Sequence, residues 1–148
     1  MVLLRTDANH PDFRHLVKEL DAELAITDGD EHEFYHQFNG VENIHHVILA
    51  YIDDAAIACG AIKHYDDQRI EVKRMFVLPS FRGNGYAFQI LGALESWSKT
   101  LGYTHCILET GVKQPEAIRL YTKSQYQQID NYGQYAAVEN SLCYQKAL

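Results

Sequence analysis

The chain lacks any hydrophobic run long enough to cross a membrane, and residues 1–10 contain no apolar segment of the kind that a secretory signal needs. Positive charge is also scarce, because 13 Lys and Arg stand against 20 Asp and Glu, for a net charge of -7. Nucleic acids and anionic membranes bind clusters of Lys and Arg. We therefore expect neither of them as a principal partner.

Cysteine is equally sparse, and the three that occur, Cys59, Cys106 and Cys143, show no C-x-x-C spacing. Each lies in an apolar, strand-like context, so we interpret all three as reduced core residues of a cytoplasmic protein rather than catalytic thiols. Hydrophobic residues make up 47% of the 148 residues and charged residues 22%, as in ordinary globular proteins. This length and composition predict a single domain over residues 1–148.

Hydrophobic periodicity predicts a mixed α/β fold of about seven strands and about four helices. The expected strands are residues 2–5, 46–52, 55–64, 69–78, 104–109, 126–129 and 142–146. The expected helices run from Asn9-His10-Pro11 to the break at Asp28-Gly29-Asp30, over 31–38, over 85–101, and onward from Pro115. Tight turns at Asp53-Asp54 and Asp66-Asp67 would join the second, third and fourth strands into an antiparallel meander.

The most informative segment is the run from Arg82 to Ala87, which follows the strand ending at Leu78 and opens a helix. The first amide groups of a helix have no intrahelical acceptor and carry partial positive charge, so they bind phosphate oxygens. Gly83 and Gly85 permit positive φ angles and a close approach of the backbone to a bulky anion. The run therefore predicts a phosphate site, although an ordinary strand-to-helix loop also contains such glycines.

The order of elements extends this pattern: a strand, the R-x-x-G-x-A turn, a long amphipathic helix, a strand with Leu108-Glu109-Thr110, and a helix carrying Ala117-Ile118-Arg119-Leu120-Tyr121. Over nearly its whole length the chain resembles the GCN5-related N-acetyltransferase (GNAT) family. The resemblance implies a mostly antiparallel mixed sheet whose fourth and fifth strands splay apart. It also implies acetyl-CoA as the donor, bound through its pyrophosphate at the turn.

The activity implied by the resemblance is direct acetyl transfer to an amine within a ternary complex, without a metal or a cysteine intermediate. The acceptor would be an amine of a small molecule or a protein, and a cationic amine suits the acidic chain. A longer acyl group remains open. Homodimers are common in this family, but no sequence feature here establishes one.

The resemblance assigns the donor contacts to two segments. The backbone amides of Met75, Phe76 and Val77 would contact the acetyl and pantetheine groups. The pyrophosphate would bind at Arg82, Gly83, Asn84, Gly85, Tyr86, Ala87 and Phe88. A further donor contact is implied at Gln114, which stands before the fourth helix where the family commonly has Asn and whose longer amide caps a helix poorly.

Tyr121 follows Glu109 by twelve residues. This spacing is similar to that of the family's ribosomal-protein acetyltransferase branch, in which the Glu is a base and the Tyr an acid. By this resemblance Tyr121 would protonate the departing thiolate and Glu109 would accept a proton from the ammonium. Two structural interpretations compete with these roles: Tyr121 as a core tyrosine, and Glu109 as a solvated or ion-paired strand acid.

Glu71 is a second candidate for the base, because many family members use an acid on the fourth strand. Strand alternation would place it on one face with Lys73, Met75 and Val77. An ion pair with Lys73 is the competing interpretation. The sequence does not choose between Glu71 and Glu109.

The segment from His32 to His36 spells H-E-x-x-H, in which two His side chains share one face of a helix and bind zinc. A zinc-dependent hydrolase is therefore an alternative function, but no third ligand follows at a known spacing. A noncatalytic acyl-CoA-binding module, in which Tyr121 and the acids are only structural, is a further alternative.

By the resemblance, the early helices form one wall of the acceptor groove. The expected contacts there are His32, Tyr35, His36 and Asn39, which otherwise are surface residues around a packed Phe34 and Phe38. The loop over residues 131–135 borders the groove from the opposite side, so Tyr132 and Tyr135 would close it. Aromatic packing at the end of the sheet is the alternative for both tyrosines.

Overall fold

The computed structural model describes residues 1–31, 35–36 and 40–148, in which seven strands form one sheet of order β1-β2-β3-β4-β5-β7-β6. The strands are β1 (Val2–Thr6), β2 (His46–Ile52), β3 (Ala55–His64), β4 (Arg69–Val77), β5 (His105–Gly111), β6 (Gln127–Ile129) and β7 (Ser141–Ala147). The α-helices in the described ranges are α1 (Pro11–Asp28), α3 (Tyr86–Thr100) and α4 (Pro115–Lys123), and none of them is long and apolar enough to cross a membrane. The predicted mixed α/β fold is confirmed, while the helix expected over 31–38 falls largely outside the described residues.

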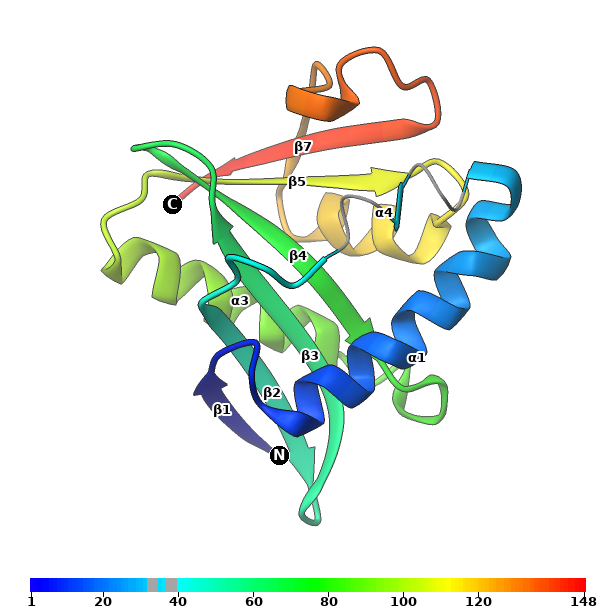
Figure 1. The fold of residues 1–148 in the computed structure, drawn as a ribbon. Coiled ribbons are helices and arrows are strands. Elements are labelled where there is room, and N and C mark those ends of the chain that lie inside the picture. The colour runs from blue at the N-terminus through cyan, green and yellow to red at the C-terminus, as the bar shows by residue number, and fades with distance from the viewer. Residues whose placement is uncertain (32–34, 37–39) are drawn as a thin grey trace.

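The predicted meander of β2, β3 and β4 is confirmed. Asp53 and Asp54 both have positive φ angles, of 49° and 64°, as a two-residue hairpin turn that follows the twist of its strands requires. Neighbouring strands pair antiparallel throughout the sheet except for β4 and β5, which are parallel. Figure 1 shows this sheet with α1 crossing it.

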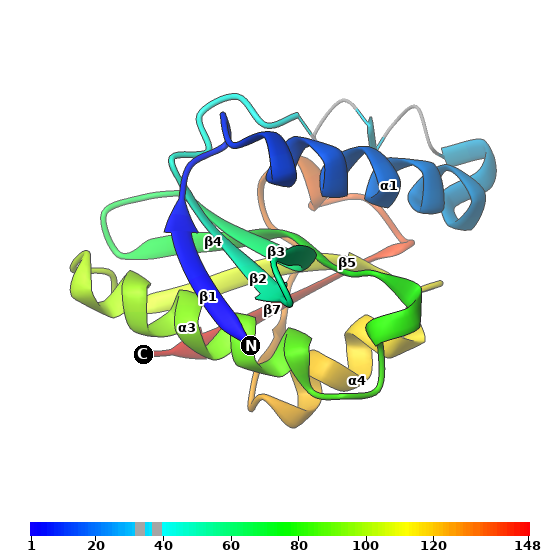
Figure 2. The same ribbon diagram turned by 90° about the horizontal axis from the view of Figure 1, so that it is seen from below.

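The helices divide between the two faces of the sheet, with α1 on one face and α3 and α4 on the other (Figure 2). On the α1 face, Phe13 and Leu16 pack against Val47 and Leu49. The opposite face is covered by α3 and α4 through a larger core of apolar residues, namely Ile48, Ile57, Ile62, Ile70, Ile90, Leu91, Leu94, Leu108 and Tyr121. Every strand of the meander therefore buries both of its faces.

All three cysteines are buried, as predicted, and all are free thiols: Cys59 lies in the α1 core, Cys106 in the opposite core, and Cys143 in a smaller cluster with Ile107 and Tyr132. Burial raises the pKa of Cys59 to about 12 and the pKa of Cys106 and of Cys143 to about 11. Since the thiolate is the nucleophile, none of these side chains is poised to attack an acyl group near neutral pH.

A β-bulge at Arg74 changes which residues of β4 share a face. Cys59 pairs with Phe76, whereas Ala61 pairs with Lys73. Between these two pairs β4 has two residues, Arg74 and Met75, opposite the single residue Gly60 of β3, as in a β-bulge. Arg74 has a φ of 58°. The expectation that Glu71, Lys73, Met75 and Val77 share a face is wrong. Beyond the bulge, Met75 and Val77 pack on the α3 side, whereas Phe76 packs with the α1 core.

β4 and β5 pair only at their first residues, from Arg69 opposite His105 to Glu71 opposite Ile107. Beyond that point β4 stays paired with β3, while β5 stays paired with β7 as far as Gly111 opposite Ser141. The predicted splay is therefore confirmed, and Figure 1 shows the two strands diverging. From residue 72 onward, the edge of β4 that faces β5 has no ladder partner.

Gly60 allows α3 to lie close to β3, and this packing is testable. A Cβ at Gly60 would lie 2.5 Å from Met75 Sδ, 2.8 Å from Ile90 Cγ2 and 2.9 Å from Leu94 Cδ1. We expect Gly60→Ala to lower the free energy of unfolding by about 1 kcal/mol or more, because these side chains must shift.

Gly92, on the exposed surface of α3, supplies the control, since a Cβ there meets nothing within 4 Å. Gly92→Ala should raise the free energy of unfolding by up to about 1 kcal/mol, because Ala favours helix more than Gly does. Urea denaturation measures both variants. A Gly60→Ala variant as stable as the unsubstituted protein would contradict the tight packing.

Candidate active site

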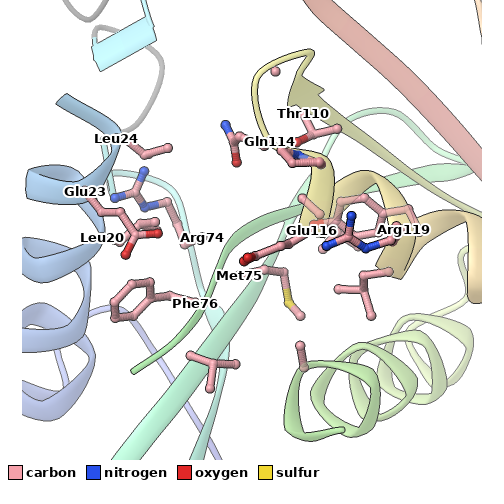
Figure 3. A pocket seen from close by; sticks show the side chains of 18 of the residues that line it. Leu20, Glu23, Leu24, Arg74, Met75, Phe76, Thr110, Gln114, Glu116 and Arg119 are labelled. Atoms are coloured by element: carbon pink, nitrogen blue, oxygen red, sulfur yellow. The ribbon is translucent and has the colours of Figure 1, made fainter. Parts of the chain in front are cut away.

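A cleft of about 860 Å³ opens where β4 and β5 separate. Figure 3 shows it between α1, which contributes Leu20, Glu23 and Leu24, and the start of α4, with β4 along its floor. Its volume is that of a typical small-molecule or cofactor site. The cleft therefore places the unpaired edge of β4 within reach of a ligand.

The glycine-rich turn forms one end of this cleft. Gly83 and Gly85 have φ angles of 83° and 81°, and Gly85 is the N-cap of α3 but offers no side chain to bond its first amides. Tyr86, Ala87 and Phe88 of the first turn line the cleft. A Cβ at either glycine would meet nothing within 4 Å, so the backbone angle, rather than space, requires glycine here.

Arg82 and Asn84 hold the shape of this turn. The Arg82 side chain donates from Nε to the Val77 carbonyl at 2.9 Å and from Nη2 to Glu23 Oε2 at 2.8 Å, which ties the end of β4 to α1. Asn84 Nδ2 donates to the Phe81 carbonyl at 3.0 Å. Arg82 lies in the lining of the cleft and Asn84 does not, so their predicted contacts with phosphate stay predictions.

The predicted donor contacts Met75, Phe76 and Val77 all line the cleft. Their backbone belongs to the part of β4 that has no partner in β5. In Figure 3 the Met75 side chain lies away from α1, whereas Arg74 and Phe76 lie toward it. The divergence of β4 from β5 thus leaves unpaired backbone groups along the cleft, and the bulge directs the side chains of Met75 and Phe76 to its two sides.

The α4 side of the cleft is rich in positive charge, with Lys113, Arg119 and Lys123 in its lining beside Glu116. Gln114 also lines the cleft, and it is the N-cap of α4 without a side-chain bond to that helix, as its longer amide predicted. Lys and Arg beside two helix N-termini attract anions.

The two candidate bases, Glu71 and Glu109, both line the cleft but differ in their partners. Glu71 Oε2 accepts a hydrogen bond from the Tyr132 hydroxyl at 2.5 Å, and its Oε1 lies 3.5 Å from Lys73 Nζ. The predicted ion pair with Lys73 is therefore present. Glu109 Oε2 accepts from Ser141 Oγ at 2.6 Å, and no hydrogen bond from the described residues reaches its Oε1.

Burial raises the pKa of Glu109 to about 7, and the nearby carboxylates of Glu71 and Asp28 add to this effect. The Ser141 hydroxyl and Lys73 oppose it, because both favour the charged carboxylate. Glu109 therefore changes its protonation state near neutral pH.

Tyr121 is a core tyrosine, as one of the two interpretations expected, and it also lies in the lining of the cleft, so its role as an acid stays a prediction. Its ring packs in the core, 5.8 Å from the ring of Tyr126 and 6.4 Å from that of Tyr144, and its side chain also lines the cleft. Burial and the charge of Glu109 raise its pKa, so the hydroxyl stays protonated. Tyr121 packs on the α3 and α4 face together with Leu108, whereas Glu109, the next residue along β5, points to the opposite face.

Only some of the residues predicted to contact the acceptor lie in the lining of the cleft. Tyr35 and Tyr135 line the cleft, whereas Tyr132 does not, because its buried side chain bonds Glu71 instead. His36 is exposed and outside the lining, and His32 and Asn39 lie outside the described residues. The described parts of the chain contain no cluster of three or more metal-ligating side chains, but most of the H-E-x-x-H segment is not among them.

Sequence reasoning missed Ser141 and Arg74. Ser141 immediately precedes the strand expected over 142–146, and a start one residue earlier would have placed it opposite Gly111 in the ladder. Arg74 forms an ion pair with Asp21 of α1 and has a side chain only 2% exposed. Its left-handed backbone has no signal in the sequence, because arginine rarely adopts it.

Comparisons with known proteins agree with this geometry. Residues 10–126 match the model of the Acetyltransferase (GNAT) family. The IAA acetyltransferase of Azospirillum brasilense is 33% identical over 102 residues, which are 68% of this chain and 67% of that protein.

Solved structures show the same fold. A Klebsiella pneumoniae protein described as an acyl-CoA N-acyltransferase superposes with a TM-score of 0.83 at 26% identity, over 99% of this chain and 97% of that one. A GNAT acetyltransferase from Elizabethkingia anophelis with acetyl-CoA bound gives a TM-score of 0.74 at 17% identity, over 99% and 97%. The fold and the cleft are those of an acyltransferase. The chain belongs to the GNAT family of acetyltransferases, as the resemblance implied.

Two ion pairs join α1 to the region of β4, Arg74 with Asp21 and Arg82 with Glu23. Because the first pair is more buried than the second, we expect its loss to cost more free energy of unfolding. Asp21→Asn leaves the Arg74 guanidinium buried without its carboxylate, and Arg74 Nε already has no acceptor among the described residues. We expect a loss of about 2–3 kcal/mol in the free energy of unfolding, below the cost of breaking a fully buried pair because Asp21 is 29% exposed.

Glu23→Gln is the matched control on the same helix. Its partner Arg82 is 34% exposed and Glu23 is 43% exposed, so its loss should cost less than about 1 kcal/mol. Denaturant unfolding of both variants gives the comparison. Equal losses would show that the Arg74 pair is not desolvated as described.

Proposed function

We propose that the protein transfers the acetyl group of acetyl-CoA to an amine within a ternary complex, with Glu109 as the general base and Tyr121 as the general acid. The observation that carries this proposal is the cleft through the splayed sheet, which has the carboxylate on one face and the phenol on the other. In acyl transfer the nucleophile and the leaving group are different substituents of one tetrahedral carbon, so the group that takes a proton from the one and the group that gives a proton to the other can lie apart. The family to which the chain belongs supports the same chemistry.

The residues of the cleft fit the donor. Its phosphates would meet the uncapped first turn of α3 and the positive charges of α4, Lys113, Arg119 and Lys123. When bound there, acetyl-CoA would supply a thioester carbonyl, whose oxygen could accept hydrogen bonds from the unpaired backbone amides of β4. Backbone amides are effective donors to a developing oxyanion because their dipoles do not reorganise as the charge forms.

Glu109 removes one proton from the ammonium form of the acceptor, and the neutral amine then forms the C–N bond as the C–S bond breaks. Tyr121 gives its proton to the departing sulfur, and the second proton that the nitrogen loses restores the Tyr121 phenol, so that a neutral thiol and a neutral amide are released. Glu109 suits the base better than Glu71, because its pKa of about 7 matches neutral operation. Both carboxylate oxygens of Glu71 already have partners, in Lys73 and Tyr132.

The acceptor is a primary amine of a small molecule or a protein. Carboxylates of Glu71 and Glu109 line its side of the cleft, and the net charge of -7 favours a cation further. The three free, buried thiols suit a reducing compartment, so we propose a cytoplasmic enzyme.

Donor binding is tested without knowledge of the acceptor. A ligand that binds only the folded protein raises its unfolding midpoint, by an amount equivalent to about 2.7 kcal/mol at a hundred times its Kd. We expect acetyl-CoA to raise the midpoint of the unsubstituted protein, and Gly85→Ala to reduce this shift, because alanine disfavours a φ of 81° at the N-cap of α3.

Gly102→Ala is the control, with a φ of 97° beyond the other end of α3. It should lower the midpoint itself but keep the acetyl-CoA shift. Differential scanning fluorimetry records all three proteins. An unshifted midpoint of the unsubstituted protein at millimolar acetyl-CoA argues against the donor site, as does an equal loss of the shift in both variants.

Catalysis is tested by pH–rate profiles with the best acceptor from a panel of small amines and lysine peptides. Because the base must be ionised and its pKa is raised, kcat/KM should increase as the pH rises through about 7. Glu109→Gln should abolish this limb and lower kcat/KM by about 10²–10⁴. Tyr121→Phe should lower kcat while the affinity for acetyl-CoA stays unchanged.

Glu71→Gln is the control for the choice of base, and it should keep the acidic limb of the profile. If Glu71→Gln abolishes the limb and Glu109→Gln keeps it, the two roles are reversed. If Tyr121→Phe transfers acetyl at the full rate, the phenol is structural and the proposed acid is wrong.

A further inference from the structure

A chain of hydrogen bonds leads away from Glu109 on the acceptor side of the cleft. Ser141, the first residue of β7, is 3% exposed, and its Oγ donates to Glu109 Oε2 at 2.6 Å. The same Oγ lies 3.0 Å from the Tyr35 hydroxyl. A serine hydroxyl has a single proton, which here goes to the carboxylate, so Tyr35 is the donor to Ser141.

The backbone fixes Ser141 before its side chain makes any contact. Its N–H donates to the Val138 carbonyl at 3.2 Å, and its own carbonyl accepts from Asn131 Nδ2 at 2.9 Å. The β5–β7 ladder sets it opposite Gly111. The hydroxyl is thus held by two loop contacts and a strand register, which is the kind of support that a positioned functional group needs.

The outer end of the chain reaches a second, small cavity. Tyr35 lines the main cleft and also this cavity of about 10 Å³, together with Asp28, Glu31 and Asn140. That volume is roughly what one water molecule needs, and the lining, although mostly apolar in area, includes the polar residues Asp28, Glu31, Lys113 and Asn140. Through Ser141 and Tyr35, the buried carboxyl of Glu109 is therefore connected to a second cavity as well as to the main cleft.

We propose that Ser141 is a positioning residue that orients the Glu109 carboxylate, and that Ser141 and Tyr35 carry the proton of Glu109 to the small cavity after each turnover. This inference rests on the proposed function, in which Glu109 receives the proton of the amine. In the relay, protonation of Glu109 reverses both hydrogen bonds of the resting chain, so that the carboxyl donates to Ser141 and Ser141 donates to Tyr35. The Glu109 carboxyl then gives its proton to Ser141, Ser141 gives its own to Tyr35, and Tyr35 releases one to water. Each oxygen of the two hydroxyls gains and loses one proton, so only the carboxyl is left deprotonated.

Several groups interact electrostatically with Glu109. They are Glu71 and Lys73 from β4, Asp28 from α1, Ser141 from β7, Tyr121 from α4, and Tyr35 and Tyr135. Burial and the carboxylates raise the pKa of Glu109, while the Ser141 hydroxyl and Lys73 lower it. Loss of the Ser141 hydroxyl removes one of these two opposing effects. Burial also raises the pKa of Tyr35, so its phenol stays protonated as a donor.

The experiment compares Ser141→Ala, Ser141→Thr and Tyr35→Phe with the unsubstituted protein. The pKa of Glu109 is read from ¹³C-carboxyl NMR of glutamate-labelled protein, with the resonance assigned by its absence in Glu109→Gln. We expect Ser141→Ala to raise this pKa by roughly one unit, as loss of a hydrogen bond to a charged group implies. The same shift lowers kcat/KM at pH 7 about fivefold, and the loss disappears by about pH 9.

Ser141→Thr keeps the hydroxyl and should restore both the pKa and the rate. Tyr35→Phe leaves the bond from Ser141 to Glu109 intact but interrupts the outward path. It should therefore lower kcat several-fold without moving the pKa of Glu109. A purely structural role for these residues predicts no such separation of pKa from kcat.

Unchanged pKa and pH–rate profile in a folded Ser141→Ala variant would overturn the positioning role. Full kcat in Tyr35→Phe would overturn the relay. Unfolding midpoints with and without acetyl-CoA establish that each variant is folded and binds the donor. The NMR titration needs no acceptor, so it tests Ser141 even if Glu109→Gln retains full activity, which would refute the base assignment instead.

Discussion

The structure depends on one constraint. Strand β4 stays paired with β3, and β5 stays paired with β7, so the two parallel strands β4 and β5 cannot remain paired with each other. Their ladder ends at Glu71 opposite Ile107, and the unpaired edge beyond it opens the sheet from one face to the other. An unpaired edge inside a sheet is costly unless another group bonds its amides and carbonyls. In this protein the edge lies along a cleft, where a ligand can make those bonds.

The opening also separates the chemical groups. Glu109 lies on the α1 face, with Ser141 and Lys73 favouring its ionised form, whereas Tyr121 lies among apolar and aromatic side chains on the other face. The bulge at Arg74 maintains this division, because it turns Met75 toward α3 and leaves Arg74 bonded to α1. Glu109 and Tyr121, the proposed base and acid, therefore keep distinct environments although they line one cleft.

Local signals in the sequence were enough for most of the elements. The Asp53-Asp54 turn, the glycines before α3 and Pro115 at the start of α4 each act through their own backbone, so the meander and the phosphate-type turn were predictable. The insertion of β7 between β5 and β6 depends on contacts between distant residues. The bulge depends on a rare conformation of Arg74, and the partners of Glu109 depend on the β5–β7 register, so neither followed from residue patterns.

The most direct test of this account is amide hydrogen exchange, followed by mass spectrometry, with and without acetyl-CoA. If the donor bonds the open edge of β4 and the first turn of α3, residues 75–77 and 86–88 will exchange more slowly in its presence, while β1 and β2 will remain unchanged. No protection in these two segments at saturating acetyl-CoA, or protection confined to other parts of the chain, would contradict the central claim.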